Sequence, residues 1–180
     1  MPIQIGQRPA RGFDEPLGLL SDCHRRIEHF LHVLATVADE AAGGALSPHD
    51  RTALEGALTY FAVAAPKHTA DEESSLFPRL RHSTAPEIAA TLAALEALER
   101  DHDEADAHHA AVERLGRRWV AEGRLQPDEA VALREHLARL RALYERHIAI
   151  EDQGVFPAAA RVLGDAQLAE IGREMAARRR

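Results

Sequence analysis

Two segments of this chain carry the same pattern of residues, and this repeat constrains the fold more than any other feature. The first segment spans residues 68–78 (HTADEESSLFP) and the second spans residues 147–157 (HIAIEDQGVFP). In both, a Glu follows the His by four positions and precedes a Phe-Pro pair by five. Residues four positions apart lie on the same face of an α-helix. Each segment therefore predicts a helix that directs one imidazole and one carboxylate toward the same point.

The repeat also extends toward the N-terminus of each segment. His24 precedes His68 by 44 residues, and His102 precedes His147 by 45. The acidic residues four positions after His24 and His102 are Glu28 and Asp106. A similarity with so long a period indicates a duplicated architecture, here two pairs of helices.

Bulk composition favours a single helical domain. The chain has 180 residues, which is enough for one full hydrophobic core. It is rich in Ala, Leu, Glu and Arg and has only 4% aromatic residues, a balance that favours helices over sheets. The formal net charge of -7 argues against a nucleic-acid-binding surface. The run of arginines at residues 178–180 predicts a solvated chain end.

The chain carries no signal for secretion or for crossing a membrane. Residues 1–12 lack the apolar core of a signal peptide, and no stretch approaches the length of an apolar membrane span. Cys23 is the one cysteine, so no intrachain disulfide is expected, and we interpret it as a packed thiol. We therefore expect a cytoplasmic protein that contacts neither membrane nor nucleic acid, and association into a homo-oligomer is left open.

Turn and capping residues predict where the helices begin and end. A first helix is expected from about residue 14–16 to about 40–42, where Gly43-Gly44 stops it. Ser47-Pro48 is a strong start for the second helix, which Pro66 should kink. Phe77-Pro78 should end its regular part.

The second half repeats this arrangement. A long third helix is expected from about residue 86 to 122, and a fourth from about 127 to 154–157. A short fifth helix should begin near 164–165. Short turns make neighbouring helices antiparallel, so residues 14–180 predict an all-α, up-down antiparallel four-helix bundle preceded by an arm at residues 1–13.

The four repeated histidines fall at one level of this bundle. His24, His68, His102 and His147 each lie about 18 to 20 residues from the nearest predicted turn, which at about 1.5 Å per residue gives nearly the same height. Imidazole and carboxylate ligands suit Fe, Mn and Zn, and a bundle with bridging Glu residues favours two metal ions. The predicted ligands are His24, His68, Glu72, His102, Asp106, His147 and Glu151.

Alternatives exist for individual residues. A single His on an apolar helix face is usually a hydrogen-bonded core residue. Here the repeat of the pattern favours metal ligation by the four histidines instead. Glu28 is left open as a ligand, and Glu73 is interpreted as a surface acid. Tyr144 either supplies a hydroxyl to a bound molecule or packs in the core with a buried hydrogen bond. The phenylalanines at 77 and 156 are expected to be apolar walls of the site.

Together these features resemble the hemerythrin-like family, also called the HHE cation-binding domain. The resemblance rests on residues 16–27 (PLGLLSDCHRRI), on both repeated segments and on Asp101-His102, and it covers residues 14–157. It implies a four-helix bundle with a non-haem di-iron centre. Members of this family bind or sense O2, handle nitric oxide or peroxide, or manage iron. By this resemblance His24 and His68 serve one iron and His102 and His147 the other. Glu72 and Glu151 are then the bridging carboxylates.

The chain departs from the oxygen-carrying members at two positions. Asp106 stands where they have a second His, and Glu151 stands where they have an Asp. We therefore expect a protein that binds or senses O2 or a related small oxidant such as nitric oxide or peroxide. A di-metal enzyme, either an oxidase or a peroxide or nitric-oxide reductase, is the alternative. A third possible function is that of an iron-responsive regulatory module.

Overall fold

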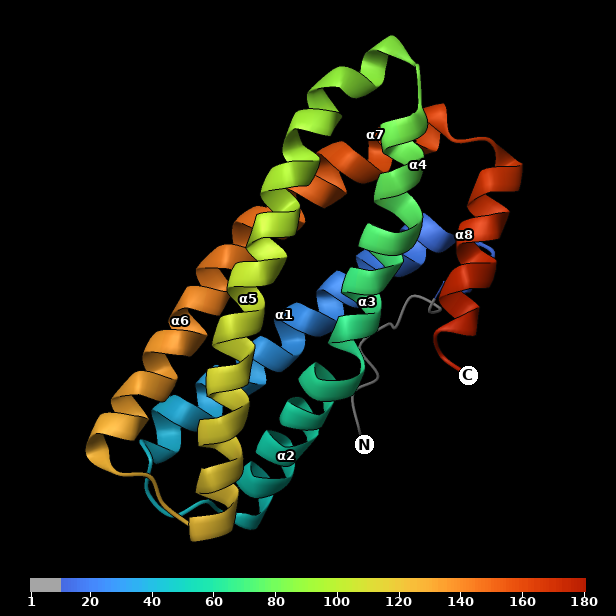
Figure 1. The fold of residues 1–180 in the computed structure, drawn as a ribbon. Coiled ribbons are helices and arrows are strands. Elements are labelled where there is room, and N and C mark those ends of the chain that lie inside the picture. The colour runs from blue at the N-terminus through green and yellow to red at the C-terminus, as the bar shows by residue number, and fades with distance from the viewer. Residues whose placement is uncertain (1–10) are drawn as a thin grey trace, which may run out of the picture.

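Every regular element in the computed structural model is helical across residues 11–180, the part of the chain that the structure describes (Figure 1). The all-α prediction is therefore confirmed. The predicted arm at residues 1–13 falls almost entirely outside the described residues.

Four long helical stretches form the body of the molecule. They are α1 (Pro16–Ala41), α2 (Pro48–Val63) with its continuation α3 (Ala65–Asp71), α5 (Ala89–Glu122) and α6 (Pro127–Ile150). The packed pairs are α1 with α2, α2 with α5, α5 with α6, and α6 with α1, so the four stretches close into a ring. Short connections make successive stretches antiparallel, as Figure 1 shows. This is the predicted up-down bundle.

Helix ends follow the capping residues. The Ser47 hydroxyl oxygen accepts a hydrogen bond from the backbone N–H of Asp50 at 3.1 Å and caps α2. Gly43 and Gly123 stand just beyond the ends of α1 and α5 with φ values of 78° and 75°. Such positive φ angles suit glycine because it has no Cβ, which is why these helices stop where the sequence predicts.

The helix after Ser47 is broken at Ala64, between α2 and α3. Pro66 lies just beyond this break, at the start of α3. Proline lacks a backbone N–H and its ring clashes with the preceding turn, so an unbroken α-helix is not tolerated here. The predicted kink is therefore present.

Each repeated segment contains a π-helical turn that begins at its Glu. These turns are η1 (Glu72–Leu76) and η3 (Glu151–Val155), and they lead into α4 (Phe77–His82) and α7 (Phe156–Val162). The fourth helical stretch thus continues past residues 154–157, where we had expected it to end. The Phe-Pro pair places proline in the first turn of the next helix, a position that needs no N–H. Single π-turns are frequent at functional sites.

The remaining elements are η2 (Pro86–Ile88) and α8 (Asp165–Ala177), the predicted fifth helix. Helix α8 packs against α1 and α3. Of the three arginines that follow it, Arg178 and Arg179 are only partly exposed, contrary to the prediction, whereas Arg180 is exposed as predicted. Arg178 and Arg179 donate hydrogen bonds to the carboxylate of Asp71 at 2.9 and 2.6 Å, and Asp71 is fully buried. A buried carboxylate requires such partners, and the residues directly after α8 supply them.

Two hydrophobic clusters fill the bundle, and a polar layer separates them. On α1, Leu20 belongs to one cluster and Ile27 to the other, with buried His24 between them. On α5, Leu98 and Ala105 flank His102 in the same way. A layer of buried polar residues across a bundle is where cofactor and metal sites are built.

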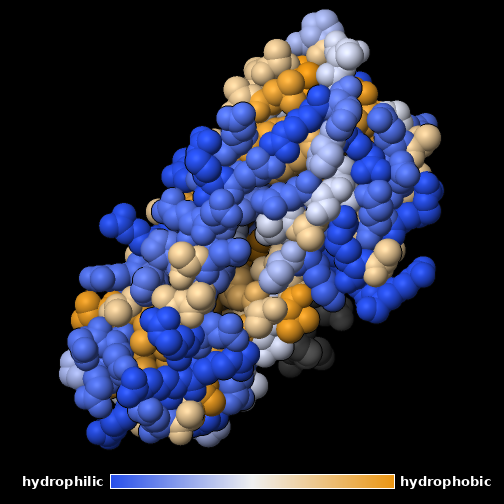
Figure 2. All heavy atoms as spheres, in the orientation of Figure 1, coloured by the Kyte–Doolittle hydropathy of each residue, from blue (hydrophilic) through white to orange (hydrophobic). Residues whose placement is uncertain are grey.

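The outer surface is mainly polar. On the face shown in Figure 2, hydrophilic side chains cover most of the surface and hydrophobic ones form scattered patches. Among residues 11–180, no helix combines the length and apolar character that a membrane span requires.

Candidate metal centre

Six of the seven predicted ligands meet in the polar layer between the two clusters. The residues are His24, His68, Glu72, His102, His147 and Glu151, and all are buried. They come from α1, α3, η1, α5, α6 and η3, so every long stretch of the bundle contributes. These residues converge because they lie at the same height in the bundle, as the helix lengths predict.

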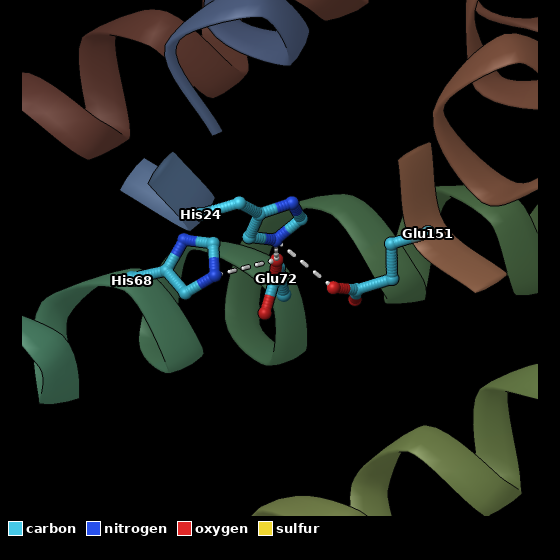
Figure 3. A group of neighbouring side chains, drawn as sticks. All are labelled: His24, His68, Glu72 and Glu151. Carbon is cyan, nitrogen blue, oxygen red and sulfur yellow. Dashed lines mark ion pairs between the residues drawn. The ribbon is translucent and has the colours of Figure 1, made fainter. Parts of the chain in front are cut away.

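The first group joins His24 and His68 to both glutamates. The Nε2 atom of His68 lies 3.2 Å from Oε1 of Glu72, and Nε2 of His24 lies 3.8 Å from the same oxygen. His24 Nε2 also lies 3.1 Å from Oε2 of Glu151. Figure 3 shows both imidazoles directed at Glu72, with Glu151 reaching in from another helix.

The second group joins His102 and His147 to the same two glutamates. His147 Nε2 lies 3.1 Å from Glu151 Oε2, and His102 Nε2 lies 3.4 Å from Glu72 Oε2. The two Nε2 atoms are 3.2 Å apart. One ligand atom from each of the four residues fits within 4.8 Å of the others, and the same holds in the first group.

Both glutamates belong to both groups, so the arrangement offers two neighbouring cation positions that share two carboxylates. Each position has two imidazole nitrogens and two carboxylate oxygens as potential ligands. Shared carboxylates between paired His ligands are the donor set of a two-metal site in a helical bundle.

The carboxylate oxygens of this layer lack hydrogen-bond donors. Both side-chain oxygens of Glu72 and both of Glu151 are buried without a hydrogen bond, as is Nε2 of His24. Burying such groups unpaired is costly, and a buried charge usually has a counter-charge or a metal. The donor set therefore fits metal cations, which would satisfy these atoms together.

The outer nitrogen of one histidine in each half is held by an acid for which the sequence analysis predicted no such contact. His102 Nδ1 lies 2.7 Å from Oε1 of Glu73, and His24 Nδ1 lies 3.1 Å from Oδ1 of Asp152. Glu73 keeps part of its side chain exposed, as its interpretation as a surface acid predicts, but the contact of its carboxylate with His102 was not expected. Glu73 and Asp152 both follow a predicted bridging Glu directly, so the repeat itself carried this signal. A carboxylate on the outer nitrogen fixes the tautomer and leaves Nε2 free for a metal.

The other two histidines have different outer surroundings. His147 Nδ1 lies 3.5 Å from Oδ2 of Asp101. The other carboxylate oxygen of Asp101, Oδ1, lies 2.7 Å from the guanidinium of Arg146. His68 Nδ1 is buried without a hydrogen bond. The repeat symmetry is thus close at the inner atoms and incomplete at the outer ones.

The predicted apolar walls are present. Phe156 stacks on the ring of His24 with centroids 5.3 Å apart, and Phe77 lies parallel to His102 at 6.4 Å. Both contacts join one repeated segment to the upstream histidine of the other half. Each half of the duplication therefore completes the surroundings of a histidine in the other half.

Electrostatics within the layer is dominated by histidine–carboxylate pairs. Burial lowers the pKa of His24, but its contacts with Asp152, Glu151 and Glu72 outweigh burial and raise that pKa to about 12. Burial raises the pKa of Glu72, but the neighbouring His68, His102 and His24 outweigh it and lower the pKa. Contacts with Glu72 and Glu73 likewise outweigh burial and raise the pKa of His102 to about 9, whereas burial lowers the pKa of His68. Without metal, protons on His24 and His102 thus balance the carboxylate charges. A metal would compete for the same positions.

Asp106 and Glu28 lie apart from the two groups. Both side chains are exposed to solvent in the described structure. Asp106 lines a cleft of about 230 Å³ that His109 and Phe61 also line. The role of Asp106 as an additional ligand stays a prediction, and Glu28 occupies a separate surface hollow.

Tyr144 makes the buried hydrogen bond that was one of its two predicted roles. Its hydroxyl lies 3.0 Å from Nε2 of His109, whose ring stacks on Phe61 at 4.5 Å. Burial, and next the charge of His108, lower the pKa of His109 to about 4. A neutral His109 with its proton on Nδ1 can accept the hydrogen bond from the hydroxyl at Nε2. Tyr144 also contacts the His147 ring edge-on, with centroids 6.2 Å apart.

The fold and this layer define a helical-bundle protein with a buried His and Glu cluster suited to cations. The family model described as the hemerythrin HHE cation binding domain matches residues 15–159 of this chain. The chain therefore belongs to the hemerythrin HHE family, as the sequence resemblance predicted, and its domain binds metal cations. It is also similar to an uncharacterized protein of Haemophilus influenzae. That relative is 29% identical over 167 residues, which cover 93% of this chain and 91% of the relative.

Proposed function

We propose that the bundle holds two iron ions and binds or senses O2 or a related small oxidant, such as nitric oxide or peroxide. In this proposal His24 and His68 serve one iron, and His102 and His147 serve the other. Glu72 and Glu151 bridge the two ions. Manganese or zinc would suit the same donors, so the identity of the metal is part of the proposal.

The observation that carries the proposal is the sharing of both glutamates between the two histidine pairs. A single structural metal would need only one closed set of four ligands. Two adjacent sets with common carboxylates support two adjacent ions instead. Four unpaired carboxylate oxygens in a buried layer add to this support, because two dications would satisfy all of them.

The protein groups leave room for a small molecule. Each set supplies four donors, whereas an iron ion commonly takes more than four, so an added molecule can complete the coordination. When bound, reduced iron would supply the electrons that an oxidant accepts. The chain itself orients the imidazoles through Glu73 and Asp152 and limits water with Phe77 and Phe156.

The proposal is tested by purifying the protein without oxygen, counting its metals and recording its optical spectrum as air is admitted. About two irons per chain and a visible band that disappears again under argon are expected. Zinc as the sole metal, or two irons without any response to O2, nitric oxide or peroxide, would contradict the proposal.

The same experiment separates the binding function from a di-metal enzyme. The hydrogen-bonded pair of Tyr144 and His109 beside His147 favours the enzyme as the second candidate, because a phenol can donate a proton near the site. Irreversible oxidation of both irons and steady consumption of a reductant would establish the enzyme. Loss of helical stability without metal, and no response to any small oxidant, would favour an iron-responsive module.

A further inference from the structure

A second histidine cluster lies on the seam between α5 and α6, away from the metal centre. His108 on α5 and His136 on α6 approach each other with their Nδ1 atoms 2.8 Å apart. Both side chains are half-buried, so their ring edges are open to solvent. Neither residue belongs to the two groups in the polar layer. The proposed iron centre therefore does not include this pair of histidines among its ligands.

We propose that His108 and His136 form a separate surface site for one divalent transition-metal ion of the borderline class, such as Cu²⁺ or Ni²⁺. The site does not depend on what the bundle centre binds. Imidazole is a preferred ligand of these ions, and two imidazoles on adjacent rigid helices form a preorganised pair of donors.

The spacing of the two nitrogens matches this class of ion. A metal–imidazole distance of about 2.0 Å and an angle of about 90° between ligands place the two nitrogens about 2.8 Å apart. Right angles between neighbouring ligands are typical of Cu²⁺ and Ni²⁺. A tetrahedral ion would need the nitrogens about 3.3 Å apart, so zinc would require a small outward shift of the rings.

The tautomer of His108 also suits a ligand. Oε1 of Glu104, one turn earlier on α5, lies 4.0 Å from Nε2 of His108, where its negative charge favours a proton on that nitrogen. Nδ1 of His108 is then free to bind a cation or to accept the proton of His136. In the metal-free protein, the 2.8 Å contact requires one proton between the two Nδ1 atoms. A cation in that position replaces the shared proton.

The charged groups around the pair include both signs. Burial is the largest cause that lowers the pKa of His136, followed by the charges of His108 and Arg114, while Glu135 opposes them. The lowered pKa keeps His136 in its neutral, metal-binding form at neutral pH. Glu104 and Glu135 offset the repulsion of Arg114 on an incoming cation.

Neighbouring residues on α5 separate this pair from the bundle centre. His109, the next residue, faces inward and bonds to Tyr144, whereas His108 faces the seam with α6. Adjacent helix positions differ in direction by about 100°. The two sites can therefore be changed independently.

The test is to add Cu²⁺ in small steps to the full-length protein as purified, after its resident metals have been counted. We expect one additional Cu²⁺ per chain, with an electron paramagnetic resonance spectrum showing two nitrogen ligands. His108→Ala and His136→Ala should each weaken this binding at least tenfold, while the resident metal count stays unchanged. His136→Gln serves as a milder second variant in case the alanine change disturbs folding.

His49→Ala is the matched control, because His49 is an exposed histidine on another helix and should leave the additional Cu²⁺ in place. Either of two results would overturn the proposal. One is that wild-type protein takes up no additional ion, and the other is that both His136 variants bind it as tightly as wild type. A change in the resident metals alone would instead bear on the proposed function of the bundle centre.

Discussion

Oε1 of Glu73 lies 2.7 Å from Nδ1 of His102, although the two residues belong to different helical stretches. Glu73 follows the shared Glu72 directly, and Asp152 follows the shared Glu151 and holds His24 in the same way. The chain thus uses adjacent acids for two tasks, one at the cation positions and one behind a histidine. This pairing couples the two halves of the duplicated architecture.

Removing the acid behind a histidine should weaken metal binding without abolishing it. Glu73→Gln keeps the size of the side chain but loses the charge that fixes the tautomer of His102. Loss of such an outer partner typically lowers metal affinity by about 10- to 100-fold. Competition with a chelator of known affinity measures the change. Glu55→Gln, an exposed acid on α2, is the control, and equal affinities in the two variants would contradict the positioning role.

Removing an inner histidine should have a larger effect. His68→Ala or His147→Ala takes away one of two imidazoles at a cation position, so we expect metal content to fall sharply. Metal analysis of purified variants measures it. His49→Ala, outside the polar layer, should retain wild-type metal content. If all three variants load metal equally, the proposed ligand assignment is wrong.

The arginines after α8 should contribute to stability through Asp71. The double change Arg178→Gln and Arg179→Gln leaves a fully buried carboxylate without its two cationic donors. Uncompensated buried charges typically cost about 3 to 5 kcal/mol, so we expect a loss of about 3 kcal/mol in the free energy of unfolding. Urea unfolding measures it. Arg180→Gln, at an exposed position, should have little effect, and a stable double variant would show that Asp71 finds other partners.

His109 should make the protein sensitive to acid. Its pKa is lowered to about 4 in the folded protein and rises to about 6.5 on unfolding. At a pH between these two pKa values, His109 is protonated in the unfolded chain and neutral in the folded protein. The free energy of unfolding should therefore fall by about 3 kcal/mol as pH drops from about 7 to about 4. His109→Gln can still accept the Tyr144 hydrogen bond but cannot take up a proton.

The variant should thus lose less stability in acid than wild type, although both share the protonation of the remaining histidines. Unfolding curves at several pH values, with both proteins in the same metal state, give the difference directly. Parallel pH profiles for the two proteins would show that another group carries the acid sensitivity.

Several features of the fold were predictable because their causes are local. Ser47 caps α2, Gly43 and Gly123 end helices with positive φ, and Pro66 interrupts a helix by its own covalent structure. The convergence of His24, His68, His102 and His147 was also predictable, since helix rise and turn position determine height in an antiparallel bundle. The end of the fourth stretch was misplaced because the π-turn leads directly into α7, whose first turn accommodates the Phe-Pro pair.

The sequence by itself thus determined the helices, their order and the level at which histidines and glutamates meet, because periodicity and capping act over a few residues. Only the tertiary structure decided which groups stand behind those ligands. Glu73 reaches His102, and Arg178 and Arg179 reach Asp71, across contacts between separate helices. His108 meets His136 across a third such contact. These pairings depend on how neighbouring helices rotate and pack, which no local pattern specifies.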